Sequence, residues 1–135
     1  IMNLLLDISD KRRNDHQIIP DHDIKDHNES IRKRFRNLIN GYSSEHHQVS
    51  WYAEALKISP DYLSKIVREY DGTSASVWIH KSIIETAKSL LKNHDLSIKE
   101  ISLRLNFPDQ SSFGRFFKSI TGQSPKAFRE GLTGR

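Results

Sequence analysis

Apolar side chains recur along most of this chain at the spacing of amphipathic helices. A first helix is expected from about Asn28 to Gly41, with one apolar face formed by Ile31, Phe35, Leu38 and Ile39. Farther along, the pattern predicts a short helix up to about residue 57, a break at residues 58–60, and a second helix up to about residue 70. A longer helix is expected over residues 75–93. Together these elements predict an all-α fold.

The stretch 97–121 repeats the plan of the stretch 48–72. At a separation of 50 residues, similar side chains pair as Leu63 with Phe113, Lys65 with Arg115, Arg68 with Lys118, Gly72 with Gly122, and Ser74 with Ser124. Upstream of the turn the separation is 49, so one residue has been inserted near the turn. Each unit consists of a short helix, a tight turn, a second helix and a glycine. The sequence therefore predicts two helix-turn-helix units joined by a connecting helix, with a final helix over about 125–132.

Local signals mark the ends of several helices. Ser97 and Glu100 have the spacing of a capping box, in which each side chain bonds to the other residue's backbone N–H. Asn106 falls in the second turn, where a left-handed backbone conformation is expected and asparagine tolerates it. Ser124 and Pro125 are a cap residue and a first-turn proline for the final helix.

The second helix of each unit has two distinct faces. We expect an inner apolar stripe made of Leu63, Ile66, Val67 and Tyr70 in the first unit and of Phe113, Phe116, Phe117 and Ile120 in the second. In the connecting helix, the expected core-facing residues are Val77, Ile84, Ala87, Leu90 and Leu91. The outer faces carry Asp61, Ser64, Lys65 and Arg68, and Gln110, Ser111, Gly114, Arg115 and Lys118. Such a face is either an ordinary solvated surface or a surface that reads base edges in a major groove.

The spacing of the two units bears on this choice. A connecting helix of 19 residues would be about 28 Å long. Major-groove faces on one side of B-DNA are about 34 Å apart. Two recognition helices held at the ends of such a helix are therefore expected to enter successive grooves.

Charge is unevenly distributed along the chain. Residues 1–30 contain 4 Lys or Arg and 7 Asp or Glu, a net charge of −3, whereas the remaining residues carry the difference from the total of +4, which is +7. The basic excess accompanies the helical pattern and favours a polyanionic partner. Residues 9–29 are polar and lack a period, so residues 1–29 are expected to be a linker or a remnant of a missing N-terminal domain, followed by one domain over 30–135.

Several function classes are disfavoured. The chain has no cysteine, which excludes disulfides, thiolate zinc sites and cysteine nucleophiles and fits a reducing, cytoplasmic compartment. No apolar run approaches the length of a membrane span. Neither a nucleophile elbow nor a metal-ligand spacing surrounds the serine and histidine residues, so we expect no enzyme activity, no metal and no cofactor.

The segment "FPDQSSFGRFFKSITGQSPKAFR" resembles the signature of the C-terminal DNA-binding domain of AraC/XylS-type transcription regulators. The stretches "ISPDYLSKIVREYDGTSASVWI" and "AKSLL" are similar to the first motif and connecting helix of that family. The chain departs from the family where it has Ile83 for the usual arginine, Val67 for phenylalanine and Asn106 for glycine. The resemblance covers about residues 30–132.

The resemblance implies a regulator that binds double-stranded DNA and recruits or positions RNA polymerase at promoters. Family members often carry an effector-binding or dimerisation domain, and we expect that such a domain belongs to a longer parent protein. By position, the base-facing residues would be Asp61, Ser64 and Lys65 in the first unit and Gln110, Ser111 and Arg115 in the second. Arg68 and Lys118 would face phosphates, with backbone amides of the helix capped by Ser97. The alternative is a basic helical module that binds an acidic protein without sequence-specific DNA binding.

Overall fold

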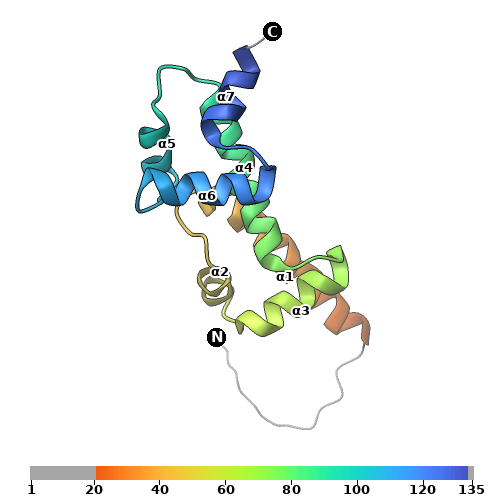
Figure 1. The fold of residues 1–135 in the computed structure, drawn as a ribbon. Helices are drawn as coiled ribbons and strands as arrows, with labels where there is room; N and C mark the ends of the chain where they lie inside the picture. The colour runs from red at the N-terminus through yellow and green to blue at the C-terminus, as the bar shows by residue number, and fades with distance from the viewer. Residues whose placement is uncertain (1–20, 134–135) are drawn as a thin grey trace. The chain divides into compact units, whose positions relative to one another are not determined.

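The structure is a computed structural model that describes residues 21–133, and this part of the chain is built from helices without strands (Figure 1). The helices are α1 (Asp21–Tyr42), α2 (Val49–Ala55), α3 (Pro60–Asp71), α4 (Ala75–Leu91), α5 (Ile98–Arg104), α6 (Gln110–Thr121) and α7 (Pro125–Thr133). The predicted all-α class and the order of two helix-turn-helix units around a connecting helix are both confirmed.

By its internal contacts the chain divides into two compact parts, residues 1–30 and residues 31–135, and both helix-turn-helix units belong to the second part. In the first, the structure describes residues 21–30, which form the N-terminal part of α1. The first helix was expected to begin near Asn28, whereas α1 begins at Asp21, so residues 21–29 are helical. The rest of the segment 1–29 lies outside the described residues. Asp23 falls in the first turn of α1, where the helix dipole favours negative charge. This segment is helical although it is polar and carries no sustained apolar stripe.

The first helix-turn-helix unit is formed by α2 and α3. The hydroxyl of Ser59 accepts a hydrogen bond from the backbone N–H of Tyr62 at 3.1 Å, which caps α3. Leu63, Ile66 and Val67 of α3 are fully buried, as the apolar stripe predicted. The helix ends at Gly72, whose φ of 72° is left-handed.

The second unit, formed by α5 and α6, repeats this construction. Its predicted capping box is confirmed, because the N–H of Ser97 donates to Glu100 Oε1 at 2.8 Å and the N–H of Glu100 donates to Ser97 Oγ at 3.0 Å. Asn106 has the predicted left-handed conformation, with φ 63°. Lys57, which lies 49 residues earlier in the first turn, has φ 61°. The repeat offset points to that residue, although its side chain type does not.

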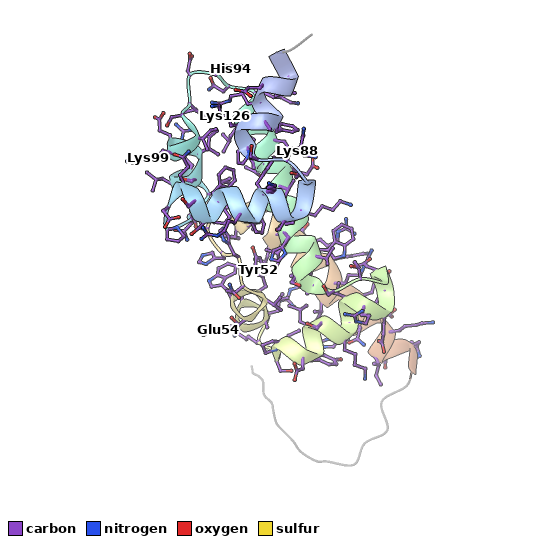
Figure 2. The ribbon with its side chains drawn as sticks, in the orientation of Figure 1. Tyr52, Glu54, Lys88, His94, Lys99 and Lys126 are labelled. Atoms are coloured by element: carbon purple, nitrogen blue, oxygen red, sulfur yellow. The ribbon has the colours of Figure 1, made fainter. Side chains whose placement is uncertain are left out.

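Two hydrophobic cores lie along α4, which runs from the first unit into the second (Figure 1). The first core joins α1, α2, α3 and the N-terminal half of α4. Tyr52 of this core is labelled in Figure 2. Its ring lies edge-on to that of Phe35, with the ring centroids 5.6 Å apart. The second core joins the C-terminal half of α4 to α5 and α6, with Phe113 and Phe117 fully buried. Phe107 and Phe116 pack against both cores. Each large buried side chain contributes about 1.5–3 kcal/mol to the fold.

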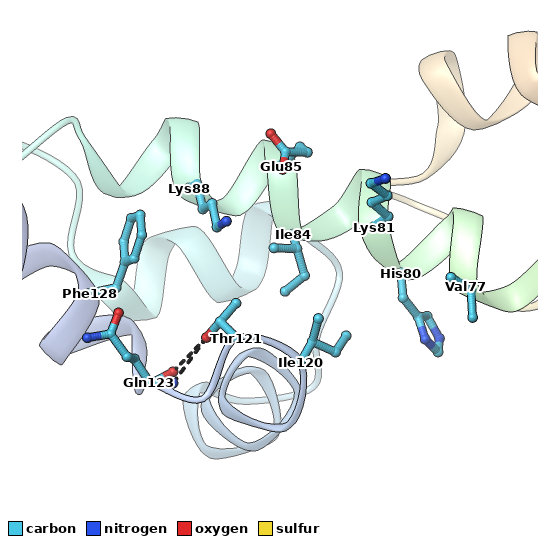
Figure 3. A pocket seen from close by; sticks show the side chains of 10 residues that line it. All are labelled: Val77, His80, Lys81, Ile84, Glu85, Lys88, Ile120, Thr121, Gln123 and Phe128. Carbon is cyan, nitrogen blue, oxygen red and sulfur yellow. Dashed lines mark hydrogen bonds between the residues drawn. The ribbon is translucent and has the colours of Figure 1, made fainter.

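Two side chains that were expected inside are exposed. Val77 is 47% exposed and Ile120 is 45% exposed. Both line an open cavity of about 510 Å³ that α4 shares with the C-terminal end of α6 and with α7 (Figure 3). Helical periodicity places these residues on the apolar faces of their helices, but no packed element covers them there.

Candidate nucleic-acid interface

The outer face of α3 is polar and accessible. Asp61, Lys65 and Arg68 are exposed, and Ser64 is half-buried. Burial of Leu63 and Ile66 on the opposite side fixes this orientation, because rotating the helix would bring apolar surface into water. The structure thus brings the four predicted residues of the first unit onto one accessible face.

The outer face of α6 has the same character. Gln110, Ser111, Arg115 and Lys118 are exposed, and Arg115 Nη2 lies 3.4 Å from Ser112 Oγ. No ion pair within the described residues engages the cations of these two faces, Lys65, Arg68, Arg115 and Lys118. Their charges are therefore available to an outside partner.

Gly114 lies on this outer face of α6. A Cβ at this position would meet no atom within 4 Å, so the packing of the chain does not require a glycine here. Glycine in a helix interior costs about 1 kcal/mol relative to alanine. A glycine at this position is explained if a partner approaches the backbone of α6 closely.

The N-terminal ends of α6 and α5 already hold carboxylates. Asp109 Oδ1 accepts from the N–H of Ser112 at 2.7 Å, and hydrogen bonds from Ser112 hold the pKa of the Asp109 carboxyl below its usual value. Hydrogen bonds from Ser97 likewise lower the pKa of Glu100. Because these carboxylates are ionised at neutral pH, they oppose a phosphate at the same helix ends.

Ser97 accordingly differs from the other predicted contact residues. Its backbone N–H donates to Glu100, so that amide is used in the capping box, whereas its hydroxyl oxygen accepts from Glu100 and keeps its own hydrogen as a donor. A phosphate contact at this end of α5 would use the Ser97 hydroxyl as a donor or the remaining backbone amides.

Basic residues of α1 contribute to the fold as well as to the surface. Arg32 Nη2 lies 2.9 Å from Asp71 Oδ1, which ties α1 to the C-terminal end of α3. Arg36 lies 4.2 Å from the centroid of the Trp78 ring, and Lys81 Nζ lies 5.3 Å from the same ring. No sequence pattern predicts these cation–ring contacts, because their members come from two helices that are far apart along the chain.

Ile83 occupies the position in the connecting helix where the resembling family usually has arginine. Its side chain is fully buried in the first core. A polar contact from this position is therefore absent, and its place is taken by apolar packing between α4 and the neighbouring helices.

The cavity beside α4 lies on a different side of α6 from the basic outer face. Figure 3 shows Ile120 and Thr121 of α6 facing Ile84 of α4, with Phe128 of α7 at one end. Thr121 Oγ1 donates to the backbone oxygen of Gln123 at 3.1 Å. The walls are mainly apolar, and none of the predicted base-facing residues contributes to them.

Across residues 21–133, no group of three or more histidine, cysteine, aspartate or glutamate side chains is arranged to hold a metal ion. Within the same range, no helix combines the length and the apolar character that crossing a membrane requires.

A family model described as a helix-turn-helix domain matches residues 52–131, which is more than half of the chain. The chain belongs to the AraC-type helix-turn-helix family. It is thus a DNA-binding domain of the kind found in transcription regulators, and the family is not one of enzymes. The matched region takes in α3, α4, α5 and α6, including both outer faces described above.

Individual AraC-type proteins show the same relationship. The arabinose operon regulatory protein of Salmonella typhimurium is 31% identical over 101 residues, which are 75% of this chain and 36% of that protein. A DNA-binding transcriptional dual regulator from Escherichia coli K-12 has 27% identity and a TM-score of 0.66, covering 78% of this chain and 94% of that chain. The C-terminal domain of AraT, a response regulator from Geobacillus stearothermophilus, has 32% identity and a TM-score of 0.69, covering 75% and 84%. The chain spans between 27% and 36% of the length of three curated relatives that match it.

Proposed function

We propose that this chain is a sequence-specific DNA-binding unit that inserts α3 and α6 into successive major grooves at a promoter. The observation that carries the proposal is the match between the two outer faces. Lys65 and Arg68 of α3 recur as Arg115 and Lys118 of α6, and all four side chains are exposed. An ordinary solvated surface has no reason to repeat its cations at the same positions in two units.

The length of α4 supports the two-groove arrangement. Its 17 residues correspond to about 26 Å. Successive grooves on one side of the duplex are about 34 Å apart, which is of the same order as the length of α4. One chain can therefore serve both grooves without a second copy.

Different residues carry sequence readout and affinity in this proposal. Asp61, Ser64 and Lys65 of α3 and Gln110, Ser111 and Arg115 of α6 contact base edges through their hydrogen-bonding groups. Arg68 and Lys118 contact phosphates, which adds affinity without sequence preference. Ser97 faces a phosphate at the start of α5, where its hydroxyl and the remaining backbone amides of the helix are the donors.

The wider role is proposed on the family relationship. Residues 30–135 act as the DNA-binding domain, and residues 1–29 connect it to an effector-binding or dimerisation domain of a longer regulator. The regulator acts in the cytoplasm and contacts RNA polymerase at the promoter. The curated relatives are longer than this chain, which supports such a domain.

Selection of bound duplexes from a random DNA pool tests the proposal directly. We expect an enriched site with two blocks separated by about 10 base pairs, centre to centre. The affinity for this site should exceed that for scrambled DNA and should fall as salt is raised from about 50 to about 200 mM. Binding that depends on salt but shows no enriched sequence would contradict the proposal and favour the protein-interaction module.

A further inference from the structure

The two helix-turn-helix units touch each other away from α4, through the loop between α1 and α2. The side-chain amide of Asn106, in the turn of the second unit, donates to the backbone oxygen of Glu45 at 2.8 Å. These residues are 61 positions apart in the sequence. The ring of His47, in the same loop, lies 4.8 Å from the ring of Phe107. The loop thus holds the turn that immediately precedes α6.

Asn106 meets two requirements at once. Its φ of 63° is a conformation that glycine adopts freely and asparagine adopts better than most other residues. The resembling family usually has glycine here, which would satisfy the backbone but could not reach Glu45. Lys57 has the corresponding conformation in the first turn, yet its side chain makes no hydrogen bond within the described residues. The bond to Glu45 is therefore an addition to the turn rather than a consequence of it.

Aromatic rings continue the contact into the protein interior. Phe107 lies 5.2 Å from Phe116, and Phe116 lies 5.2 Å edge-on from His80 of α4. Phe107 and Phe116 are the residues that pack against both cores. The contact between the two helix-turn-helix units thus consists of aromatic rings in the interior and the hydrogen bond of Asn106 at its edge.

We call this contact the joint; it consists of Glu45, His47, His80, Asn106, Phe107 and Phe116. We propose that the joint fixes the orientation of α6 relative to α3. Asn106 is then a positioning residue that sets which spacing between DNA half-sites the protein accepts. The specificity part of this inference rests on the proposed function. Two recognition helices that are fixed in one geometry bind a correctly spaced site with a high effective concentration of the second contact. If the joint is flexible, that effective concentration is lower and sites with other spacings between the half-sites are also bound.

Asn106→Gly is the informative variant, because glycine suits the turn and removes only the side chain that reaches Glu45. Lys57→Gly is the matched control, since it makes the same backbone change in the other turn. We expect Asn106→Gly to weaken binding to the selected full site by about threefold to tenfold, the fold-change that corresponds to loss of one hydrogen bond. The affinity for an isolated half-site should stay unchanged. The preference for the selected site over sites with one base pair inserted or deleted between the half-sites should become smaller. Lys57→Gly should leave all three affinities unchanged.

A second measurement is independent of DNA. Because the chain has no cysteine, Glu69→Cys on α3 and Ser119→Cys on α6 place two spin labels at unique exposed positions. Pulsed electron paramagnetic resonance then reports the distribution of distances between the spin labels on the two helices. The distribution should broaden with Asn106→Gly and keep its wild-type width with Lys57→Gly.

Each result decides one part of the inference. An equally narrow distribution in Asn106→Gly overturns the joint itself. A broadened distribution with an unchanged spacing preference overturns the role in specificity and leaves the joint as a structural contact. If no sequence is selected from the random pool, the proposed function and the specificity role both fail, whereas the spin-label distances still decide whether the joint holds the units together.

Discussion

Arg32 and Asp71 form a directed ion pair between α1 and the end of α3. Arg32 Nε donates a hydrogen bond to Asp71 Oδ1 at 2.9 Å, and Nη2 lies 2.9 Å from the same oxygen. The side chain of Asp71 is only 7% exposed, and its second oxygen, Oδ2, is buried without a hydrogen bond. The guanidinium of Arg32 is therefore the group that compensates the buried negative charge of Asp71.

Removal of the guanidinium should leave a buried carboxylate without its cation. We expect Arg32→Ala to lower the free energy of unfolding by about 3 kcal/mol, the lower end of the range for breaking a buried pair, because Arg32 is itself partly exposed. Arg34→Ala, which removes an exposed arginine from the same helix, is the control and should change stability by less than about 0.5 kcal/mol. Equal urea midpoints for the two variants would show that the pair contributes nothing specific.

Gly114→Ala should separate stability from DNA binding. The added methyl group meets no atom of the protein, so we expect the free energy of unfolding to rise by about 0.5–1 kcal/mol. Affinity for the selected DNA site should fall, because the methyl group would stand between α6 and the groove. Gly131→Ala in α7 makes the same change in open space away from both outer faces, and it should stabilise the protein without affecting DNA. An unchanged DNA affinity for Gly114→Ala would remove this residue from the interface.

Arg115 and Lys118 should respond differently to truncation. We expect Arg115→Ala to cost about 1–3 kcal/mol at the selected site and to relax the preference at one base position. Lys118→Ala should weaken binding to all sequences and reduce the salt slope by about 1. Titrations of the selected site and of scrambled DNA at several salt concentrations distinguish the two. A uniform loss for Arg115→Ala would assign that residue to phosphate contact instead.

Phe117 and Phe116 should differ in their contributions to stability, although both belong to the predicted apolar stripe. Phe117 is fully buried in the second core, so Phe117→Ala should cost about 3–5 kcal/mol. Phe116 is half-buried at the contact between the two cores, so Phe116→Ala should cost clearly less. Chemical unfolding of the two variants measures the difference directly, and equal losses would mean that α6 is rotated relative to the packing described.

Stability should fall in mild acid because of His80. Burial lowers the pKa of His80 from 6.5, and the neighbouring His47 lowers it further. Since the folded pKa lies below the unfolded one, the unfolded chain binds more protons as the solution becomes acidic. The contribution of His80 is therefore complete above pH 6.5 and is lost as the pH falls through the folded pKa.

Urea unfolding at about pH 7.5 and about pH 5 measures this loss. We expect the decrease in the free energy of unfolding to be smaller in His80→Gln than in the wild type, whereas the exposed His94→Gln should keep the wild-type decrease. A decrease that is identical in all three proteins would mean that other groups cause the acid sensitivity.

The sequence was most informative where structure depends on near neighbours. The capping box of Ser97 and Glu100 and the left-handed turn at Asn106 involve residues within one helical turn, and both were predicted correctly. The internal repeat located both outer faces, because a helix that buries one apolar stripe must expose the opposite side. The family signature then identified the class of protein, although the roles of the base-facing residues stay predictions.

Periodicity failed where burial depends on what lies opposite. Val77 and Ile120 are on the expected faces of their helices, yet they are exposed because α4, α6 and α7 leave a cavity between them. At the N-terminal side, the polar composition of residues 21–29 suggested a linker, whereas this segment is part of α1. A polar sequence without a periodic stripe gives no signal for a helix that continues into a well-packed one.

The amino-acid sequence by itself therefore determined the two helix-turn-helix units, the connecting helix and the two polar faces, since these follow from interactions over a few residues. Only the tertiary structure decided how the two units are joined, because the bond between Asn106 and Glu45 and the ring contacts of Phe107 and Phe116 unite distant segments. Such pairings depend on how whole helices pack against one another, and no local pattern of residues encodes them.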